Sequence, residues 1–396
     1  MRKALKTFLP PKSCALGKDH LMGFKFEPSC GYERLHDWVF EGQTASAWVT
    51  RGGKDSCWDN FLLQHPLGQF QQSTIWARLK ELDGWKLVRV VLTLSDQIVG
   101  GFQILHRFRW WGGIGYISRG PVAPVQYPEL VNFTAELVRK ICENERLLAL
   151  VVQPPDCCPL MAASLARRGF IPGMSLGVYR ATLIFDLRAG FAPVYLRMAR
   201  QTRRKIRQAV SRGIRIREGG RQDLEVFFDL MLSTCRRQRV EPNPPDVRHL
   251  FALWDAARPL ECIRLFLAEY QGKPVCGITC IPFGKTFTLW KRGWDGTEAK
   301  RHPNDLITSE VLKIAAREGY DFCDYSEFDE QMALAVEEGE PLTAGQACSR
   351  HGFIAHFGGK PRFLAQVLLY LPNPYLRSVT FTLYRWMTVL RSGLRL

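Results

Sequence analysis

The stretch from Arg197 to Gly220 carries an unusual concentration of positive charge. It holds nine basic residues before its first acid, Glu218, and eight of the nine are arginine. Like charges three or four residues apart on a helix repel by about 0.2 to 0.5 kcal/mol per pair, so a solvated face normally mixes lysine with glutamate. Arginine binds phosphate at two points. The stretch predicts a phosphate-bearing ligand, a nucleotide substrate or RNA. The alternative is a solvated face whose arginines pair with acids elsewhere in the fold.

Helical spacing divides this stretch into two faces. An apolar stripe, expected to face a core, consists of Leu196, Ala199, Ile206 and Val210. A basic stripe, expected to face the ligand, consists of Arg197, Arg200, Arg204 and Arg207, with Arg203 and Lys205 beside it. Gly213 is well placed to end the helix.

The C-terminal part of the chain is basic and aromatic. No acid follows Glu340, and basic residues alternate there with Phe, Tyr, Trp and Leu. This mixture suits a segment that lies on an anionic bilayer surface. A packed C-terminal helix is the alternative.

Composition indicates the class of protein. A chain of 396 residues with 46% apolar residues can bury two cores, and its net charge of +16 favours anionic partners. The N-terminal apolar run is broken by Lys6, Pro10 and Pro11, so no secretion signal is expected. We expect a cytoplasmic protein, possibly peripheral on the inner membrane face, that does not span the membrane. Because the twelve cysteines are scattered without a C-x-x-C motif, neither a disulfide scaffold nor a metal site is expected.

Two segments of the chain repeat one design. Residues 85–105 and 262–283 each read as a β-hairpin, and Val99-Gly100-Gly101 corresponds to Val275-Cys276-Gly277 at a spacing of 176 residues. A helix and then a strand follow each hairpin. The pattern predicts an α/β fold with mixed sheets, built from two copies of one unit by internal duplication. The predicted divisions are a partly disordered leader (1–54), a first domain (55–185), a second domain (186–365) and a basic aromatic helix or tail (366–396).

Several pieces of sequence, taken in order, resemble one known family. They are "GQFQQSTIWARLK" (68–80), "YISRGPV" (116–122), "TRRKIRQAVSRGIRI" (202–216) and "GFIAHFGGK" (352–360). In this order they resemble the Fem family of peptidoglycan-bridge aminoacyltransferases, which have two tandem acetyltransferase-like (GNAT) domains. The resemblance covers most of residues 60–365.

The resemblance implies an activity and its partners. Members of the Fem family transfer an amino acid from aminoacyl-tRNA to an amine of a cell-wall precursor, UDP-linked or lipid-linked. The amine attacks the ester carbonyl directly, so neither a metal nor a separate cofactor is expected. The protein would position the reactants, stabilise developing charge and arrange for a proton to be taken from the amine.

Site residues carry over from the family position by position. Lys80 resembles a lysine that holds the precursor diphosphate, with help from Arg203, Arg204, Lys205 and Arg207, and Arg119 matches a basic position of the family's turn. Asp324 stands where the family has an acid beside the groove. For Lys80 the alternative is a charge that favours the helix dipole, and for Asp324 it is a capping carboxylate.

One position departs from the family. The segment that corresponds to "GFIAHFGG" commonly carries a Phe-Lys pair, but here Phe353 is followed by Ile354. Loss of that charge would weaken stabilisation of the oxyanion or the tRNA end by about 2 to 4 kcal/mol. His356 or Lys360 could substitute for it.

Two other functions remain open from the sequence. An acyl-CoA-dependent N-acyltransferase would need a pyrophosphate loop of the type R/Q-x-x-G-x-G/A, and "QIVGGF" and "RWWGGI" both fail at the last small residue. A non-catalytic adaptor that binds RNA or precursor would explain Ile354.

Overall fold

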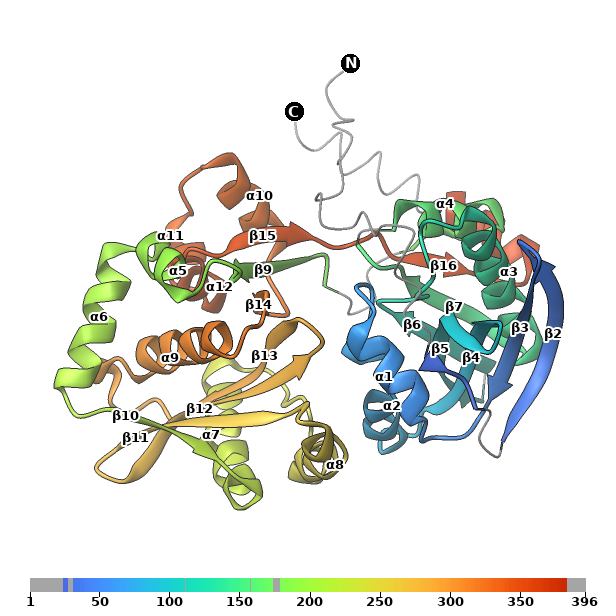
Figure 1. Ribbon diagram of the computed structural model, residues 1–396. Helices are drawn as coiled ribbons and strands as arrows, with labels where there is room; N and C mark the ends of the chain where they lie inside the picture. Colours follow the sequence, from blue (N-terminus) through green and yellow to red (C-terminus); the bar gives the residue numbers. More distant parts are fainter. Residues whose placement is uncertain (1–23, 28–30, 111, 157, 174–178, 383–396) are drawn as a thin grey trace. The chain divides into compact units, whose positions relative to one another are not determined.

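The computed structural model describes residues 24–27, 31–110, 112–156, 158–173 and 179–382. The chain forms two compact units, one from residues 1–176 and 365–396 and the other from residues 177–364. Each unit is built on one mixed sheet with helices against it (Figure 1).

The first unit has its sheet in the order β2-β3-β4-β5-β6-β7-β16-β8, with β1 pairing to β5. Helix α3 packs on α4 and β7, and α2 packs on β4. The elements are β1 (Phe24–Lys25), β2 (Tyr32–Phe40), β3 (Gln43–Thr50), α1 (Ser56–Gln64), η2 (Phe70–Gln72), α2 (Thr74–Glu81), β4 (Lys86–Leu94), β5 (Gln97–Arg109), β6 (Gly112–Ser118), α3 (Pro128–Asn144), β7 (Leu147–Gln153), α4 (Pro159–Arg167), β8 (Ile171–Pro172) and β16 (Leu368–Tyr370).

The second unit has its sheet in the order β10-β11-β12-β13-β14-β9-β15. Helix α9 packs on β11 and β12 and against α6, and α7 packs on β12 and β13. The elements are β9 (Ala181–Asp186), α5 (Phe191–Arg197), α6 (Arg200–Ser211), β10 (Arg215–Gly219), η3 (Arg221–Asp223), α7 (Leu224–Gln238), α8 (Val247–Ala257), η4 (Arg258–Leu260), β11 (Arg264–Tyr270), β12 (Lys273–Phe283), β13 (Thr286–Trp294), η5 (Ala299–Arg301), α9 (Pro303–Arg317), β14 (Phe322–Asp324), α10 (Glu330–Glu338), α11 (Ala344–Ala347), α12 (Arg350–Ala355) and β15 (Lys360–Phe363).

The two predicted hairpins form through the same kind of turn. Ser95 and Asp96, between β4 and β5, have φ angles of 46° and 63°, and Gln271 and Gly272, between β11 and β12, have 49° and 76°. Two consecutive residues with positive φ match the right-handed twist of the flanking strands. These local turns fix the register of each hairpin.

The two sheets share one core topology, as the repeat predicts. In the first, β4, β5 and β6 are antiparallel, α3 follows, and β7 returns parallel to β6. In the second, β11, β12 and β13 are antiparallel, α9 follows, and β14 returns parallel to β13. The fold is therefore two tandem units of one α/β design.

The structure corrects the predicted domain boundaries. Strand β9, which we assigned to the first domain, pairs with β14 and β15 of the second sheet. Strand β16, which we assigned to a separate tail, pairs with β7 and β8 of the first sheet. Both errors arise because the hydrogen-bond partners of these strands are far away in sequence.

The predicted leader and tail also contribute to the first unit. Residues 32–50 form β2 and β3, and β3 pairs with β4, so this part of the leader is ordered sheet. The rest of the leader before Phe24 lies outside the described residues. In the tail, residues 374–382 are helical, and Arg377 donates to the Leu371 carbonyl at 2.9 Å and lies over the Tyr370 ring. Residues 383–396 lie outside the described part.

Replacing Tyr370 with alanine should destabilise the first unit by about 3 to 5 kcal/mol, the usual cost of removing a buried large aromatic side chain. Tyr370 is 2% exposed, stacks on Phe170 at 4.7 Å and donates to Glu143 Oε1 at 2.6 Å. Urea unfolding and hydrogen exchange in β7 would measure the loss. Tyr375→Ala is the matched control because Tyr375 is 82% exposed, and it should change stability by less than about 0.5 kcal/mol. Equal stability of the two variants would show that β16 does not stabilise the sheet.

Candidate active site

Helix α6 carries the basic stretch, but its core face differs from the predicted stripe. Thr202, Ile206 and Ala209 are buried, whereas Leu196 is 68% and Val210 is 61% exposed. For Leu196 the prediction failed because the helix is interrupted: α5 ends at Arg197, and the extended ψ of 142° at both Met198 and Ala199 resets the helical register before α6 begins. Val210 lies at the edge of the buried face of α6 itself. Gly213, with φ of +84°, ends the helix as predicted.

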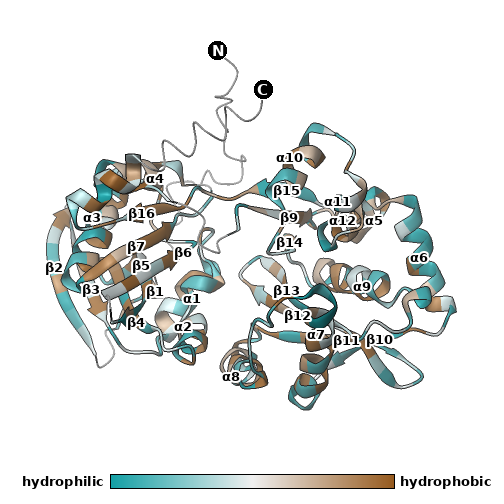
Figure 2. Cartoon of the chain, turned by 180° about the vertical axis from the view of Figure 1, so that it is seen from behind, coloured by the Kyte–Doolittle hydropathy of each residue, from teal (hydrophilic) through white to brown (hydrophobic). Residues whose placement is uncertain are grey.

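The charged side of α6 forms what we call the α6 cationic stripe. Figure 2 shows α6 as largely hydrophilic. The stripe consists of Arg200, Arg203, Arg204, Lys205 and Arg207.

The α6 cationic stripe has no acid against it. Within the residues that the structure describes, no salt bridge joins a member of the stripe to an aspartate or glutamate. The hydrogen bond found for the stripe's side chains is from Arg207 Nη1 to the Tyr195 hydroxyl, at 3.3 Å. Arg200, Arg204 and Arg207 are exposed at helical spacing. Their mutual repulsion is therefore not offset by ion pairing within the described fold.

Arg292 of β13 lies among aromatic rings. Its guanidinium is 5.3 Å from the centre of the Tyr325 ring and 5.7 Å from that of Phe353. Arg292 Nη2 donates to Thr308 Oγ1 at 3.0 Å, and the buried Nε has no hydrogen-bond partner. A guanidinium held by cation–π contacts, with donor capacity unused, is suited to receive an oxygen anion.

Asp305 lies at the start of α9, close to these charges. Its carboxyl is in the first helical turn, and the residue is 6% exposed. Burial raises the pKa of Asp305 to about 6, and the positive charges of Lys205 and Arg292 act in the opposite direction. A carboxylate with a pKa near the working pH can exchange protons effectively. Arg292, Asp305, Lys205 and Phe353 therefore form the candidate active site of the second unit.

Phe353 and its neighbour explain the departure from the family pattern. Ile354 is fully buried in the core of the second unit, so a lysine there would bury its ammonium group. Phe353 is half-buried and packs on Phe357 at 5.3 Å. The positive charge that accompanies Phe353 in this chain is Arg292.

His356 and Lys360, the predicted substitutes for that charge, lie at the end of α12 and at the start of β15. His356 is exposed at the end of α12, where its carbonyl accepts the Ala199 N–H at 2.8 Å and joins α12 to the start of α6. Lys360 is exposed at the start of β15 and pairs with Ile184 of β9. Their proposed roles stay predictions.

Asp324 lies on the other face of the sheet from Phe353. Cys323 and Tyr325 point into the core that contains Ile354, and side chains alternate along a strand, so Asp324 points away from it. Its Oδ1 accepts hydrogen bonds from the Thr182 hydroxyl and from the Ser326 N–H, the latter at 2.7 Å. These contacts are those expected for the alternative role of Asp324, a carboxylate that caps the backbone. Asp324 and Phe353 do not form one site.

Lys80 and Arg119, in the first unit, both have acidic partners. Lys80 Nζ lies 3.0 Å from Asp83 Oδ2 and 5.1 Å from the centre of the Trp76 ring. Arg119 Nη1 lies 3.1 Å from Asp156 Oδ2, and its side chain is 12% exposed. A phosphate at either cation would compete with a carboxylate already present.

Neither Arg292 nor Asp305 was singled out from the sequence. Asp305 reads there as an acid that favours a helix N-terminus, and Arg292 as one of two basic residues near the end of a strand. Only burial and the neighbours brought by other elements distinguish them.

Within the described residues, no group of His, Cys, Asp and Glu is arranged to hold a metal ion, and no helix is long and apolar enough to cross a bilayer.

Comparison with known proteins defines the class. Residues 197–331 match the model described as acetyltransferase (GNAT) domain, and residues 54–167 match the model of the FemAB family. The solved structure of FemX superposes with a TM-score of 0.69 at 18% identity, covering 81% of this chain and 96% of that one. The chain therefore has the tandem GNAT-like fold.

Within that class, sequence similarity points to one group of proteins. The lipid II:glycine glycyltransferase of Staphylococcus saprophyticus is 28% identical over 233 residues, which is 56% of each chain. That of Staphylococcus epidermidis is 26% identical over 229 residues, 55% of each chain. The alignments span little more than half the length of these relatives. The predicted resemblance to the Fem family is confirmed.

The raised pKa of Asp305 predicts a specific pH dependence of stability. Because the pKa is near 6 in the folded state and 3.8 in the unfolded state, the folded chain binds more protons between these values. The free energy of unfolding should therefore fall as the pH rises from about 4 to above 6, by on the order of 3 kcal/mol. Asp305→Asn should remove this contribution. Denaturant unfolding of wild type and of Asp305→Asn across this pH range measures the free energy of unfolding of each. The contributions of the other carboxylates cancel in the difference between the two. Identical slopes in the two chains would contradict the burial argument.

Proposed function

We propose that this protein is an aminoacyltransferase that moves an amino acid from aminoacyl-tRNA to an amine of a peptidoglycan or other cell-envelope precursor. The observation that carries the proposal is the α6 cationic stripe, which has no acidic partner in the described fold and whose Lys205 acts electrostatically on Asp305 of the candidate active site. RNA phosphates supply the negative charges that would pair with such a stripe. The named relatives are lipid II:glycine glycyltransferases, which supports a precursor of the cell wall as acceptor.

The residues of the candidate active site suit attack of an amine on an ester. The amine nitrogen bonds to the ester carbonyl carbon, the carbonyl oxygen becomes an oxyanion, and the carbon–oxygen bond to the ribose then breaks. In this proposal Asp305 accepts the proton that the amine loses and returns it to the leaving ribose oxygen. Arg292 stabilises the oxyanion. Neither a metal nor a separate cofactor takes part.

Arg292 would supply the charge that Ile354 cannot provide. Its guanidinium is 5.7 Å from the centre of the Phe353 ring, whereas Ile354 points into the core. In this proposal the aromatic residue Phe353 still has a cation beside it, but the cation is Arg292 of β13 and not a lysine of α12. With a tRNA donor and a UDP-linked or lipid-linked acceptor, the reaction belongs at the cytoplasmic face of the membrane.

An acyl-CoA-dependent N-acyltransferase is the second candidate, because residues 197–331 match the GNAT domain. Two helix starts argue against it. α3 follows β6 and α9 follows β13, the last of three successive antiparallel strands in each unit, and each helix has proline in its first turn together with an acid, Glu129 or Asp305. Proline removes an N–H donor and the carboxylate repels phosphate, so both helices are poor pyrophosphate sites.

The proposal is tested by incubating the purified protein with charged tRNAs and with UDP-linked and lipid-linked cell-wall precursors. Mass spectrometry should detect precursor that has gained one amino-acid residue, only when the tRNA is charged. Arg292→Met should lower the rate about 10²- to 10³-fold, as expected for loss of an oxyanion donor. Arg292→Lys keeps the charge and should retain more activity.

Two outcomes would count against the proposal. A product that forms with acyl-CoA and without tRNA would favour the acyltransferase alternative. Binding of precursor or tRNA without any product, under conditions in which a known relative is active, would favour a non-catalytic adaptor.

The α6 cationic stripe should dominate binding of tRNA. Replacing Arg203, Arg204 and Arg207 together with alanine should weaken binding and reduce the slope of log affinity against log salt by about 2 to 3, roughly one per lost phosphate contact. The matched control replaces Arg215, Arg236 and Arg317, which are exposed and remove the same charge. Filter binding between low and moderate salt measures both variants. An equal effect of the two triples would mean that net charge alone, and not α6, attracts the RNA.

A further inference from the structure

One end of the first sheet exposes large apolar side chains. Trp110, in the turn after β5, is 95% exposed, Phe108 is 50% and Leu148, at the start of β7, is 45%. Phe108 is paired in register with Gly113 and lies so close to it that a Cβ there would be 2.7 Å from the Phe108 ring. Leu148 lies closer still to Gly112, where a Cβ would be 2.1 Å from its Cδ1. The glycines of β6 therefore let these side chains gather around the hairpin between β5 and β6.

Basic residues surround this apolar group. Lys86 of β4 pairs in register with His106 of β5, two residues before Phe108, and Arg109 and Arg146 are exposed at the same end of the sheet. Within the described residues Lys86 makes no salt bridge. Arg51 forms an ion pair with Glu145 at 2.5 Å. Lys86 thus brings a positive charge that no carboxylate neutralises directly.

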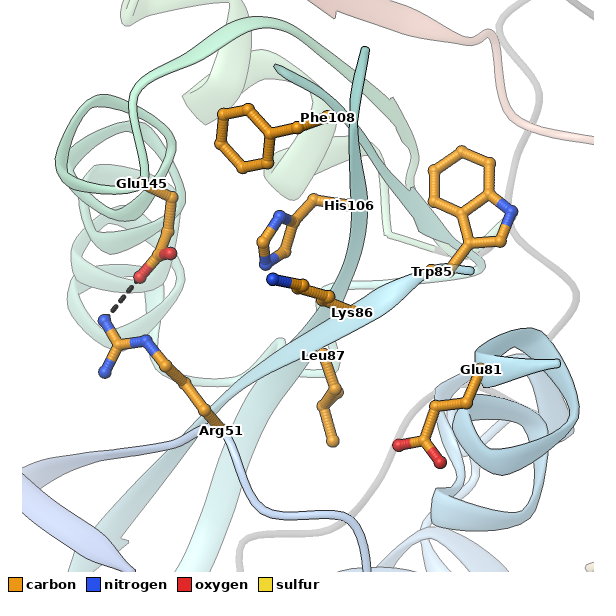
Figure 3. A pocket seen from close by; sticks show the side chains of 8 residues that line it. All are labelled: Arg51, Glu81, Trp85, Lys86, Leu87, His106, Phe108 and Glu145. Carbon is orange, nitrogen blue, oxygen red and sulfur yellow. Dashed lines mark hydrogen bonds and ion pairs between the residues drawn. The ribbon is translucent and has the colours of Figure 1, made fainter. Parts of the chain in front are cut away.

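A pocket of about 390 Å³ opens beside the hairpin (Figure 3). Figure 3 shows the Lys86 ammonium next to the His106 ring, with Phe108 above it and Glu81 on a different wall. His106 is 4% exposed, packs edge-on against Phe108 at 5.7 Å, and has no hydrogen-bond partner for Nδ1. The pocket is lined by Arg51, Glu81, Trp85, Lys86, Leu87, His106, Phe108 and Glu145.

We propose that this end of the first unit docks on an anionic membrane surface, with Phe108 and Trp110 in the headgroup region and a lipid phosphate held by Lys86 and His106. Tryptophan and phenylalanine prefer the boundary between headgroups and acyl chains, and each basic residue near an anionic leaflet contributes about 1 kcal/mol. The ion pair between Arg51 and Glu145 fixes one wall of the phosphate site. The exposed aromatic side chains would contact the headgroup region. Lys86 and the buried His106, whose Nδ1 has no hydrogen-bond partner, would contact the phosphate of the same lipid.

A membrane explains this end better than a protein or RNA partner does. Protein interfaces normally bury an aromatic anchor in a pocket of the partner, yet here Trp110 is 95% exposed, and charged residues such as Lys86 and Glu145 line the pocket beside it. Stacking on RNA would need only Trp110 and would leave the pocket unused. This inference goes beyond the proposed reaction. It requires neither tRNA nor precursor, although a lipid-linked acceptor would lie in the same membrane plane.

The test is co-sedimentation of the full chain with phosphatidylcholine vesicles, with and without phosphatidylglycerol. Wild type should bind only the anionic vesicles. Phe108→Ser combined with Trp110→Ser should lower binding about tenfold or more, and Lys86→Glu several-fold. Trp110→Phe should keep binding while removing part of the quenching of tryptophan fluorescence by brominated lipid chains.

Matched controls separate the hairpin from general effects. Val39→Ser removes an apolar side chain that is 76% exposed on β2, and Lys140→Glu reverses an exposed charge on α3, so neither should change binding. The helical tail also exposes apolar side chains, and Leu376→Ser with Val379→Ser tests it as an alternative contact.

The proposal is wrong if wild type does not bind anionic vesicles, or if the hairpin double variant binds like wild type while the tail variant does not. Displacement of the vesicles by short RNA that contacts Trp110 would also overturn it. Because the vesicles contain no precursor and no tRNA, failure here leaves the proposed transfer reaction standing. Failure of the transfer assay likewise leaves this membrane contact standing.

Discussion

In each sheet, one strand runs parallel to its neighbour, β7 in the first sheet and β14 in the second. The structure depends on a further strand that pairs with the other edge of this strand. β7 lies between β6 and β16, and β14 lies between β13 and β9. In both cases the second neighbour comes from a segment distant in sequence, residues 368–370 for β7 and residues 181–186 for β14. Without these strands, the backbone N–H and C=O groups on one side of β7 and β14 would lack partners next to a buried core. Helix α3 packs on β7 itself, and α9 packs on β11 and β12 of the sheet that β9 extends, so these pairings complete the sheets on which both helices lie.

The same pairings mark how far sequence could predict the fold. The hairpins and the units of helix and strand followed from local patterns, because two-residue turns and the spacing of apolar residues are set by neighbours in sequence. The order of elements, the mixed sheets and the duplication were therefore predicted correctly. The domain ends were not, since "ATLIFD" and "LLY" are short apolar runs that would suit either sheet. Only the distant partner decides which sheet each joins.

The candidate active site divides in the same way. Charge on α6 could be predicted because composition and helical spacing define it without any knowledge of packing. The importance of Arg292 and Asp305 could not, because it comes from burial of one carboxylate and from two rings, that of Tyr325 just after β14 and that of Phe353 in α12. The apparent loss of a family lysine at Ile354 also has a packing explanation. That position faces the core here, where a lysine would bury its ammonium group.

The distribution of ion pairs shows which positive charges are available to a ligand. Arg217 bonds to Asp223 and Glu269, and Arg264 to Glu218 and Glu318, so these arginines stabilise the second unit itself. Lys80 and Arg119 are likewise occupied by carboxylates of the first unit. The α6 cationic stripe lacks such partners although acids are present in the same unit. Placing five basic residues in two to three helical turns costs stability through repulsion, and within the described residues no carboxylate on that face offsets it. An anionic ligand would provide the compensation, so the proposed RNA contact rests on this stripe and not on the paired cations of either unit.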